Sequence, residues 1–313
     1  MKLFLVIPCY NEEEVLPETA RRLKEKMNAL INDQKITSDS AVVFVNDGSK
    51  DKTWDLIAGL HREDPLFRGI SLSRNRGHQN ALIAGLMTVW EECDAAITLD
   101  ADLQDDIDVI DLMVERFAEG YDVVYGVRSD RRKDSFFKRT TAQGFYKTMR
   151  VLGVETVYNH ADFRLMSRRA LEALSEFREV NLFLRGIVPL IGFPSTTVSY
   201  ERGERLAGKT KYPLRKMLSF AAEGITSMSV KPIRLIASLG FFIFLVSIGF
   251  LIWSLIRHFT GQTVSGWASL SVSIWALGGL QLLALGVIGE YIGKIYLETK
   301  ARPRYIVSEY LRD

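Results

Sequence analysis

Short apolar runs alternate with amphipathic stretches over residues 2–127. The first run, 2–8, leads into a stretch whose apolar residues step by four and three, as on one face of a helix: Leu16, Ala20, Leu23, Met27 and Leu30. Asn11 and Glu14 have the spacing of a capping box at the start of this helix. Further apolar runs lie at 41–46, 69–72, 95–99 and 122–127, with helical stretches near 54–60, 79–90 and 107–117. This alternation predicts an α/β fold, with right-handed crossovers and a mostly parallel sheet covered by helices on both faces.

Two long uncharged stretches near the end of the chain predict a membrane anchor. Residues 235–256 contain no charged side chain, and neither do residues 259–289. Roughly 20 such residues cross the hydrocarbon core of a bilayer as a helix, so we expect a hairpin of two transmembrane helices. Lysine and arginine residues precede the first stretch and follow the second, and the positive-inside rule therefore predicts that both chain ends are cytoplasmic. The alternative, two buried helices of a large soluble domain, would need a shell of protein around both.

These patterns divide the chain into four parts: a cytoplasmic domain at 1–212, a juxtamembrane segment at 213–232, two membrane helices at 233–290 and a cytoplasmic tail at 291–313. The juxtamembrane segment mixes apolar and basic residues, which suits a helix lying in the membrane interface, although an ordinary packed helix has the same pattern. The second apolar stretch and the turn after it contain small residues that allow close helix contact and favour a homo-oligomer: Gly278, Gly279, Gly286, Gly289 and Gly293.

Composition excludes a disordered chain, and local charge is more informative than total charge. The 313 residues are 47% hydrophobic, with Lys+Arg 40 and Asp+Glu 38. From Arg128 to Arg150, however, eight side chains are basic and two are acidic. Such a patch predicts an anionic partner: phosphate, nucleic acid or a lipid headgroup. Nucleic acid would leave the membrane hairpin unexplained, so we expect none. Cys9 and Cys93 lack metal-ligand spacing and fit a reducing compartment.

Polar residues follow each of the first four predicted strands. In a parallel sheet the ligand site lies beyond the carboxyl ends of the strands, so we expect four segments to meet there: 8–12, 46–49, 73–75 and 100–104. The sequence contains no G-x-G-x-x-G, which argues against a dinucleotide fold.

Asp100 and Asp102 come directly after the fourth strand, where a turn would let both carboxylates reach one cation. A solvated turn is the commoner explanation of a lone D-x-D pair, but Asp47 at a second strand end and the amide oxygen of Gln104 favour a cation. Hard oxygen ligands select Mg²⁺ or Mn²⁺, and such an ion binds a diphosphate and stabilises it as a leaving group.

These segments resemble a known family. P-C-Y-N-E at 8–12, N-D-G-S at 46–49, S-R-N-x-G at 73–77 and D-A-D-L-Q at 100–104 resemble the inverting family 2 glycosyltransferases of the GT-A fold. The resemblance is closest to the branch that transfers a sugar to a polyisoprenyl phosphate. This branch includes dolichyl-phosphate mannose synthase and the bactoprenol-phosphate glucosyltransferases. A-D-F-R-L-M at 161–166, A-G-K-T-K-Y at 207–212 and G-E-Y-I-G-K-I-Y at 289–296 extend it over nearly the whole chain. The sequence departs from the family pattern at two places. The family's D-D-G-S reads N-D-G-S here, and the family's D-L-Q-x-P-P reads D-L-Q-D-D-I.

The resemblance assigns roles to particular residues. It places the nucleoside on Pro8, Tyr10, Glu12 and Asp47, and the metal and diphosphate on Asp100, Asp102 and Gln104, with Asp102 and Asp162 as catalytic residues. The family pattern places the acceptor phosphate on Arg128 and Arg139, with Arg131 and Lys133 in support. The glycine-containing segment with Arg205, Lys209 and Lys211 is typical of a lid that closes over diphosphate or acceptor.

Asp162, in A-D-F-R, is the candidate catalytic acid or base. A phosphate monoester has a second pKa of about 6 and is largely a dianion at neutral pH, so the acceptor scarcely needs to lose a proton. We therefore predict that Asp162 positions the acceptor or the sugar more than it abstracts a proton. For His78, beside Gly77, and His160, close to Asp162, a structural hydrogen bond is the expected role.

The sequence as a whole predicts inverting transfer of a sugar, glucose or N-acetylglucosamine, from a UDP donor to a polyprenyl phosphate at the cytoplasmic membrane face. A GDP-mannose donor is the alternative within this class. A non-catalytic membrane scaffold that keeps a nucleotide-sugar fold is the alternative outside it. A processive polysaccharide synthase would carry more membrane spans and a Q-x-x-R-W motif, which this sequence lacks.

Overall fold

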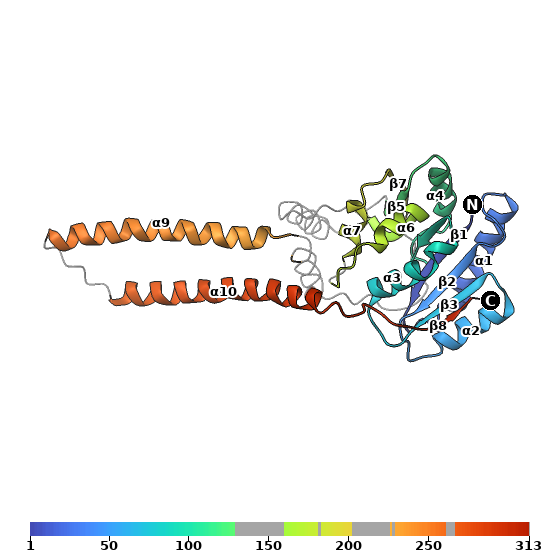
Figure 1. The fold of residues 1–313 in the computed structure, drawn as a ribbon, viewed down its shortest axis with the longest axis horizontal. Helices are drawn as coiled ribbons and strands as arrows, with labels where there is room; N and C mark the ends of the chain where they lie inside the picture. Colours follow the sequence, from blue (N-terminus) through green and yellow to red (C-terminus); the bar gives the residue numbers. More distant parts are fainter. Residues whose placement is uncertain (129–159, 181–182, 202–225, 227–228, 261–266, 313) are drawn as a thin grey trace.

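The computed structural model describes residues 1–128, 160–180, 183–201, 226, 229–260 and 267–312 (Figure 1). The described strands form one sheet in the order β7-β5-β6-β4-β1-β2-β3-β8. They are β1 (Leu3–Cys9), β2 (Ala41–Asn46), β3 (Phe67–Leu72), β4 (Ala95–Thr98), β5 (Val123–Arg128), β6 (His160–Ser167), β7 (Ser195–Tyr200) and β8 (Val307–Leu311). β6 and β8 run antiparallel to their neighbours, and the remaining pairs are parallel. The predicted mostly parallel sheet is confirmed.

Helices cover both faces of the sheet, as predicted. One face carries α1 (Leu16–Asn32), α2 (Thr53–Glu63) and α4 (Val109–Ala118), and the other carries α3 (His78–Val89), α6 (Arg168–Ser175) and α7 (Leu184–Leu190). In β1, Leu3, Leu5 and Ile7 belong to the first core, whereas Phe4 and Val6 belong to the second. Successive side chains of a strand point to opposite faces, so a strand between two helix layers is apolar at every position.

The start of α1 differs from the predicted capping box. The helix begins at Leu16, with Val15 at the cap and no side-chain cap hydrogen bond. Asn11 has φ 56°, and its side-chain oxygen accepts a hydrogen bond from the backbone N–H of Lys50 at 2.8 Å. The prediction is wrong because Asn11 ties the loop after β1 to the loop after β2. Pro17 then opens the helix, since a helix start tolerates its missing N–H.

Close packing fixes α3 against the sheet. Gly85 lies directly over β1 and β2, where an added Cβ would lie 2.7 Å from Val45 Cγ2 and would also clash with Val6. The absence of a side chain therefore lets the helix approach the strands closely. This contact positions the first turn of α3, and with it His78, at the carboxyl edge of the sheet.

Two long helices leave the α/β domain together. α9 (Lys231–Phe259) and α10 (Trp267–Thr299) contact each other and extend away from the sheet (Figure 1). In the part of the chain that the structure describes, one stretch, Leu277–Thr299, is long and apolar enough to cross a membrane, with a hydropathy of 1.3. The sequence pattern places the end of the second span at residue 290. α10 continues beyond it to Thr299, through the charged residues Glu290 and Lys294.

The chain then returns to the sheet, which the sequence pattern does not predict. β8 pairs antiparallel with β3, with Ile70 opposite Tyr310. The Arg68 guanidinium donates to Glu92 at 2.7 Å and to the Tyr310 hydroxyl at 3.4 Å. Arg304 donates to the carbonyl of Phe177 at 3.1 Å. Residues 304–311, predicted as part of a tail, are thus fixed to the α/β domain.

Candidate active site

Asp100 and Asp162 meet because of the strand directions. Asp100 follows β4 at its carboxyl end, and β6 is the antiparallel neighbour of β4, with Arg164 opposite Thr98. An antiparallel strand enters at the edge where its parallel neighbours end, so the first residues of β6 lie beside the residues that follow β4. The Thr98 hydroxyl secures this junction by donating to the Asp162 carbonyl at 2.5 Å.

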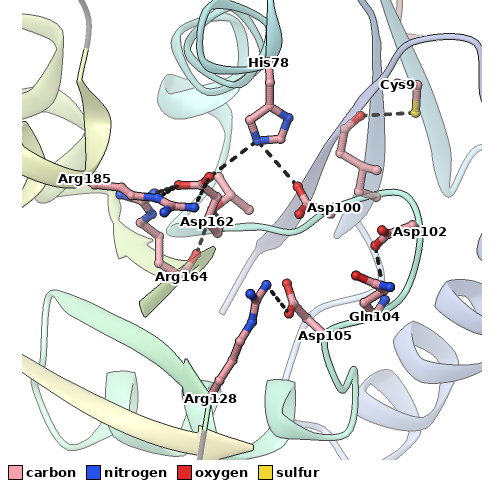
Figure 2. Close-up of polar contacts among 12 residues, drawn as sticks. Cys9, His78, Asp100, Asp102, Gln104, Asp105, Arg128, Asp162, Arg164 and Arg185 are labelled. Atoms are coloured by element: carbon pink, nitrogen blue, oxygen red, sulfur yellow. Dashed lines mark hydrogen bonds and ion pairs between the residues drawn. The ribbon is translucent and has the colours of Figure 1, made fainter. Parts of the chain in front are cut away.

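The turn after β4 gathers acidic side chains (Figure 2). Leu103 adopts a left-handed conformation, with φ 47°, and the Asp102 carboxylate accepts a hydrogen bond from the Gln104 backbone N–H at 3.2 Å. Burial and the charges of nearby carboxylates raise the pKa of the Asp100 carboxyl to about 6, although His78 lowers it in part. Burial is the larger cause, and the neighbouring carboxylates add to it, so this carboxyl ionises less readily than an exposed one.

These side chains fit a divalent cation that is bound in part by substrate. The described residues contain no group of three or more His, Cys, Asp and Glu side chains arranged to hold a metal alone. Mg²⁺ commonly binds through one or two carboxylates together with substrate phosphates, so Asp100 and Asp102 suffice on the protein side. The raised pKa of Asp100 is consistent with such a site, since a bound cation would favour the ionised form.

Asp162 is held by basic side chains on several sides (Figure 2). Arg164, which is buried, donates to Asp162 Oδ1 at 2.6 Å, and Arg185 from α7 donates to Oδ2 at 3.1 Å and to Oδ1 at 3.3 Å. Burial acts to raise the pKa of the Asp162 carboxyl. The contact with His78 and the charges of the two arginines outweigh burial and hold this pKa well below its ordinary value. Such a carboxylate is a weak proton acceptor.

His78 lies between the two acidic groups. Its Nε2 atom is 3.5 Å from Asp100 Oδ1 and 3.7 Å from Asp162 Oδ2. Burial acts to lower the pKa of His78, but the contact with Asp162 and the charge of Asp100 raise it overall. His78 thus contacts both Asp100, in the turn after β4, and Asp162, in β6. This arrangement is consistent with the expected structural role. The side chain of His160 lies outside the described residues.

On the opposite side of the site, Arg128 at the end of β5 pairs with Asp105. The two side chains are 3.2 Å apart, and the Tyr200 hydroxyl donates to the same Asp105 oxygen at 2.6 Å. Asp105 is buried and Arg128 is partly exposed. The pair therefore places one predicted acceptor-binding arginine at the edge where the acidic turn lies.

The nucleoside residues lie in the loops after β1 and β2. Asp47 is buried and accepts hydrogen bonds from the backbone N–H groups of Arg76 at 2.7 Å and Gly77 at 2.9 Å. Gly48 has φ 63°, and a Cβ there would lie 2.5 Å from the backbone nitrogen of Asn75, so only glycine fits between the loops. The Asp47 carboxylate therefore holds the turn before α3. Its contact with a nucleoside base stays a prediction.

The other predicted residues of this group are placed as follows. Pro8 is buried in β1, and the Tyr10 side chain is 42% exposed. The backbone N–H of Glu12 donates to the Thr53 hydroxyl at 2.9 Å, which joins the loop after β1 to the start of α2. Contact of these residues with a nucleoside stays a prediction.

Six predicted residues lie outside the described residues: Arg131, Lys133, Arg139, Arg205, Lys209 and Lys211. Conversely, the structure adds Arg164, Arg185, Asp105 and Tyr200 to the site, and sequence reasoning assigned none of them a role. A signal exists for Arg185, which is the lone charge in the otherwise apolar segment 182–190. Arg164 and Asp105 stand within the motifs A-D-F-R and D-L-Q-D-D.

A mostly parallel sheet with helices on both faces and an acidic turn beyond a central strand define a glycosyltransferase of the GT-A fold. The family model for glycosyl transferase family 2 matches residues 4–175. The chain belongs to glycosyl transferase family 2.

Relatives extend the similarity over nearly the whole chain. The uncharacterized glycosyltransferase YkoT of Bacillus subtilis (strain 168) is 54% identical over 306 residues, which cover 98% of this chain and 91% of that protein. The bactoprenol glucosyl transferase of Shigella phage SfX is 42% identical over 313 residues, which cover 98% and 99%. Among solved structures, glucosyl-3-phosphoglycerate synthase from Mycobacterium tuberculosis aligns with a TM-score of 0.46 at 16% identity, over 72% of this chain and 76% of that one.

Proposed function

We propose that this glycosyltransferase transfers a sugar, with inversion, from a nucleotide diphosphate donor to a polyprenyl phosphate at the cytoplasmic face of a membrane. The observation that carries the proposal is the acidic turn at Asp100 and Asp102, placed against a clamped Asp162 at the carboxyl edge of the sheet. The similarity to bactoprenol glucosyl transferases over nearly the full length supports the lipid acceptor.

The donor diphosphate is proposed to bind at the turn after β4 through Mg²⁺ or Mn²⁺ held by Asp100, Asp102 and Gln104. When bound there, the cation neutralises charge on the leaving diphosphate. The residues of this chain orient the reactants: the loops after β1 and β2 hold the nucleoside with Pro8, Tyr10, Glu12 and Asp47, and β5 presents Arg128 to the acceptor phosphate. The arrangement derives its rate from placement and charge stabilisation.

Asp162 is proposed to position the reactants rather than to remove a proton. Its lowered pKa supports this role, because a carboxylate paired with two arginines gains little by accepting a proton. The acceptor phosphate is largely a dianion near neutral pH and attacks without prior deprotonation.

The membrane topology is proposed to be a two-span hairpin, and β8 supports it. The chain leaves the α/β domain after β7 and rejoins the same sheet at β8, so it crosses any membrane an even number of times in between. The span at Leu277–Thr299 therefore requires a second crossing, and α9, with no charge from residue 235 to residue 256, supplies it. Both chain ends then lie on one side. The small residues of α10 favour a homo-oligomer.

The sugar is proposed to be glucose or N-acetylglucosamine carried by UDP, with glucose favoured by the names of the phage relatives. Full-length protein in detergent is offered undecaprenyl phosphate with labelled UDP-glucose, UDP-N-acetylglucosamine or GDP-mannose, with Mg²⁺, with Mn²⁺ and with a chelator. We expect one UDP-sugar to label the lipid in a metal-dependent reaction. Labelling only from GDP-mannose would establish the mannosyltransferase alternative. No labelled lipid from any donor would favour the scaffold.

A further inference from the structure

The two arginines that hold Asp162 differ in exposure. The Arg164 side chain is 2% exposed and lies 2.6 Å from Asp162 Oδ1. The Arg185 side chain is 42% exposed, although its Nη2 atom lies 3.1 Å from Asp162 Oδ2. Arg164 pairs with Asp162 from the protein interior. Arg185 reaches the same carboxylate from α7, and its larger exposed fraction leaves part of its guanidinium accessible (Figure 2).

The backbone that carries Arg185 is fixed from two sides. The Leu184 N–H donates to the side chain of Gln79, next to His78 in α3, at 2.9 Å. The Leu184 carbonyl accepts from Arg164 at 3.5 Å, and Leu184 and Val188 are buried in the core with α3. Arg185 therefore presents its guanidinium from a rigid support, which lowers the entropy lost when a ligand binds.

The charges of the site divide into two halves around His78. In one half, Asp162 lies between Arg164 and Arg185, which leaves an excess of one positive charge among these three side chains. In the other half, Arg128 pairs with Asp105, and the carboxylates of Asp100 and Asp102 lie in the same turn. The acidic half matches a divalent cation. The basic half matches an anion beside that cation, and a planar guanidinium binds phosphate oxygens in pairs.

We propose that Arg185 binds the phosphate of the acceptor lipid next to Asp162. This assignment rests on the proposed function. In the transfer, a phosphate oxygen of the acceptor forms a bond to the anomeric carbon of the sugar. The bond from that carbon to the donor diphosphate breaks, and its electron pair leaves with the nucleoside diphosphate. No proton moves, since the attacking phosphate is a dianion.

The test compares wild-type protein with Arg185→Lys and Arg185→Gln in steady-state transfer from UDP-sugar to undecaprenyl phosphate. We expect Arg185→Gln to raise the KM for undecaprenyl phosphate by roughly tenfold or more, because a hydrogen bond between charged groups is lost. The KM for the UDP-sugar should stay within about twofold of the wild-type value. Arg185→Lys should have an intermediate effect, because lysine keeps the positive charge but lacks the paired N–H donors of the planar guanidinium. Arg116→Gln, an exposed arginine on α4 paired with Glu119, is the matched control.

Three results would overturn the assignment. A raised KM for the UDP-sugar alone would place Arg185 on the donor phosphate. A lowered kcat with both KM values unchanged would restrict Arg185 to positioning Asp162. Unchanged kinetics would leave it no role in binding. If Arg185→Gln unfolds at a lower temperature than wild type, the two KM values are compared between wild type and Arg185→Lys instead. Lack of lipid labelling by wild-type protein would instead contradict the proposed function, and the assignment with it.

Discussion

At the residue scale, the environment of Asp162 decides between a base and a positioning group. Two arginines and His78 hold this carboxylate ionised, with its pKa well below the ordinary value. We expect Asp162→Asn to lower kcat by about 10- to 100-fold, because the amide keeps part of the hydrogen bonding, and Asp162→Ala to lower it further. Steady-state kinetics with both variants measure this. Complete loss of turnover in Asp162→Asn with unchanged substrate affinity, and no further loss in Asp162→Ala, would instead identify a proton-transfer role.

The acidic turn predicts a pH dependence of metal binding. In the proposed site Asp100 would bind a cation in its ionised form, and the pKa of its carboxyl is raised to about 6. Protons therefore compete with the metal below that pH. We expect the affinity for Mn²⁺ in the presence of UDP to be constant above about pH 7 and to fall by roughly tenfold per pH unit below pH 6. Calorimetric titration of wild type, and of Asp106→Asn as an exposed acidic control, measures this. An affinity that is flat down to pH 5 would refute the assignment of Asp100.

Part of this residue-level picture follows from sequence. The positions after β4 and at the start of β6 stand out as D-A-D-L-Q and A-D-F-R. The partners of Asp162 do not stand out, because Arg185 lies 23 residues further along the chain and meets it only once β6 inserts antiparallel beside β4. Asp105 is hidden for a similar reason, since its partner Tyr200 lies 95 residues away at the end of β7.

At the element scale, α3 positions His78 and depends on its contact with the sheet. We expect Gly85→Ala to destabilise the protein by about 1 to 3 kcal/mol, because the new methyl group would clash with the buried side chains of Val6 and Val45. Gly59→Ala in α2 is the matched control: a Cβ there meets nothing within 4 Å, and a gain of about 0.5 to 1 kcal/mol is expected from helix propensity. Denaturant unfolding of both variants measures the difference. Equal stability of the two variants would contradict the close approach of α3.

The elements also show what an apolar pattern predicts. β1 to β5 and the helices between them are predicted, because strands buried on both faces are apolar throughout and their helices are amphipathic. β8 is not predicted: it is five residues long, its burial is partial, and its partner β3 precedes it by more than 200 residues. The pairing of β3 with β8 depends on how the long intervening chain folds, and a local sequence pattern carries no information about that.

At the scale of the whole molecule, the return of the chain to β8 predicts the topology. Single cysteines are introduced in full-length protein at Thr260, at the far end of α9, and at Arg302, between α10 and β8. Because Cys9 and Cys93 are buried, an impermeant thiol reagent should report the new residues. We expect Thr260→Cys to react in intact cells and Arg302→Cys to react only after lysis. Labelling of both positions from outside would contradict the hairpin.

The central claim is that the acidic turn after β4 binds a divalent cation and the donor diphosphate for transfer of a sugar to a lipid phosphate. The most direct measurement is the initial rate of labelled-lipid formation by chelator-treated, full-length protein as Mg²⁺ or Mn²⁺ is added, for wild type and Asp102→Asn. We predict no product without metal, recovery of the wild-type rate as metal is restored, and a loss of about 100-fold or more in Asp102→Asn. Undiminished transfer by Asp102→Asn, or by wild type in the presence of chelator, would contradict the claim.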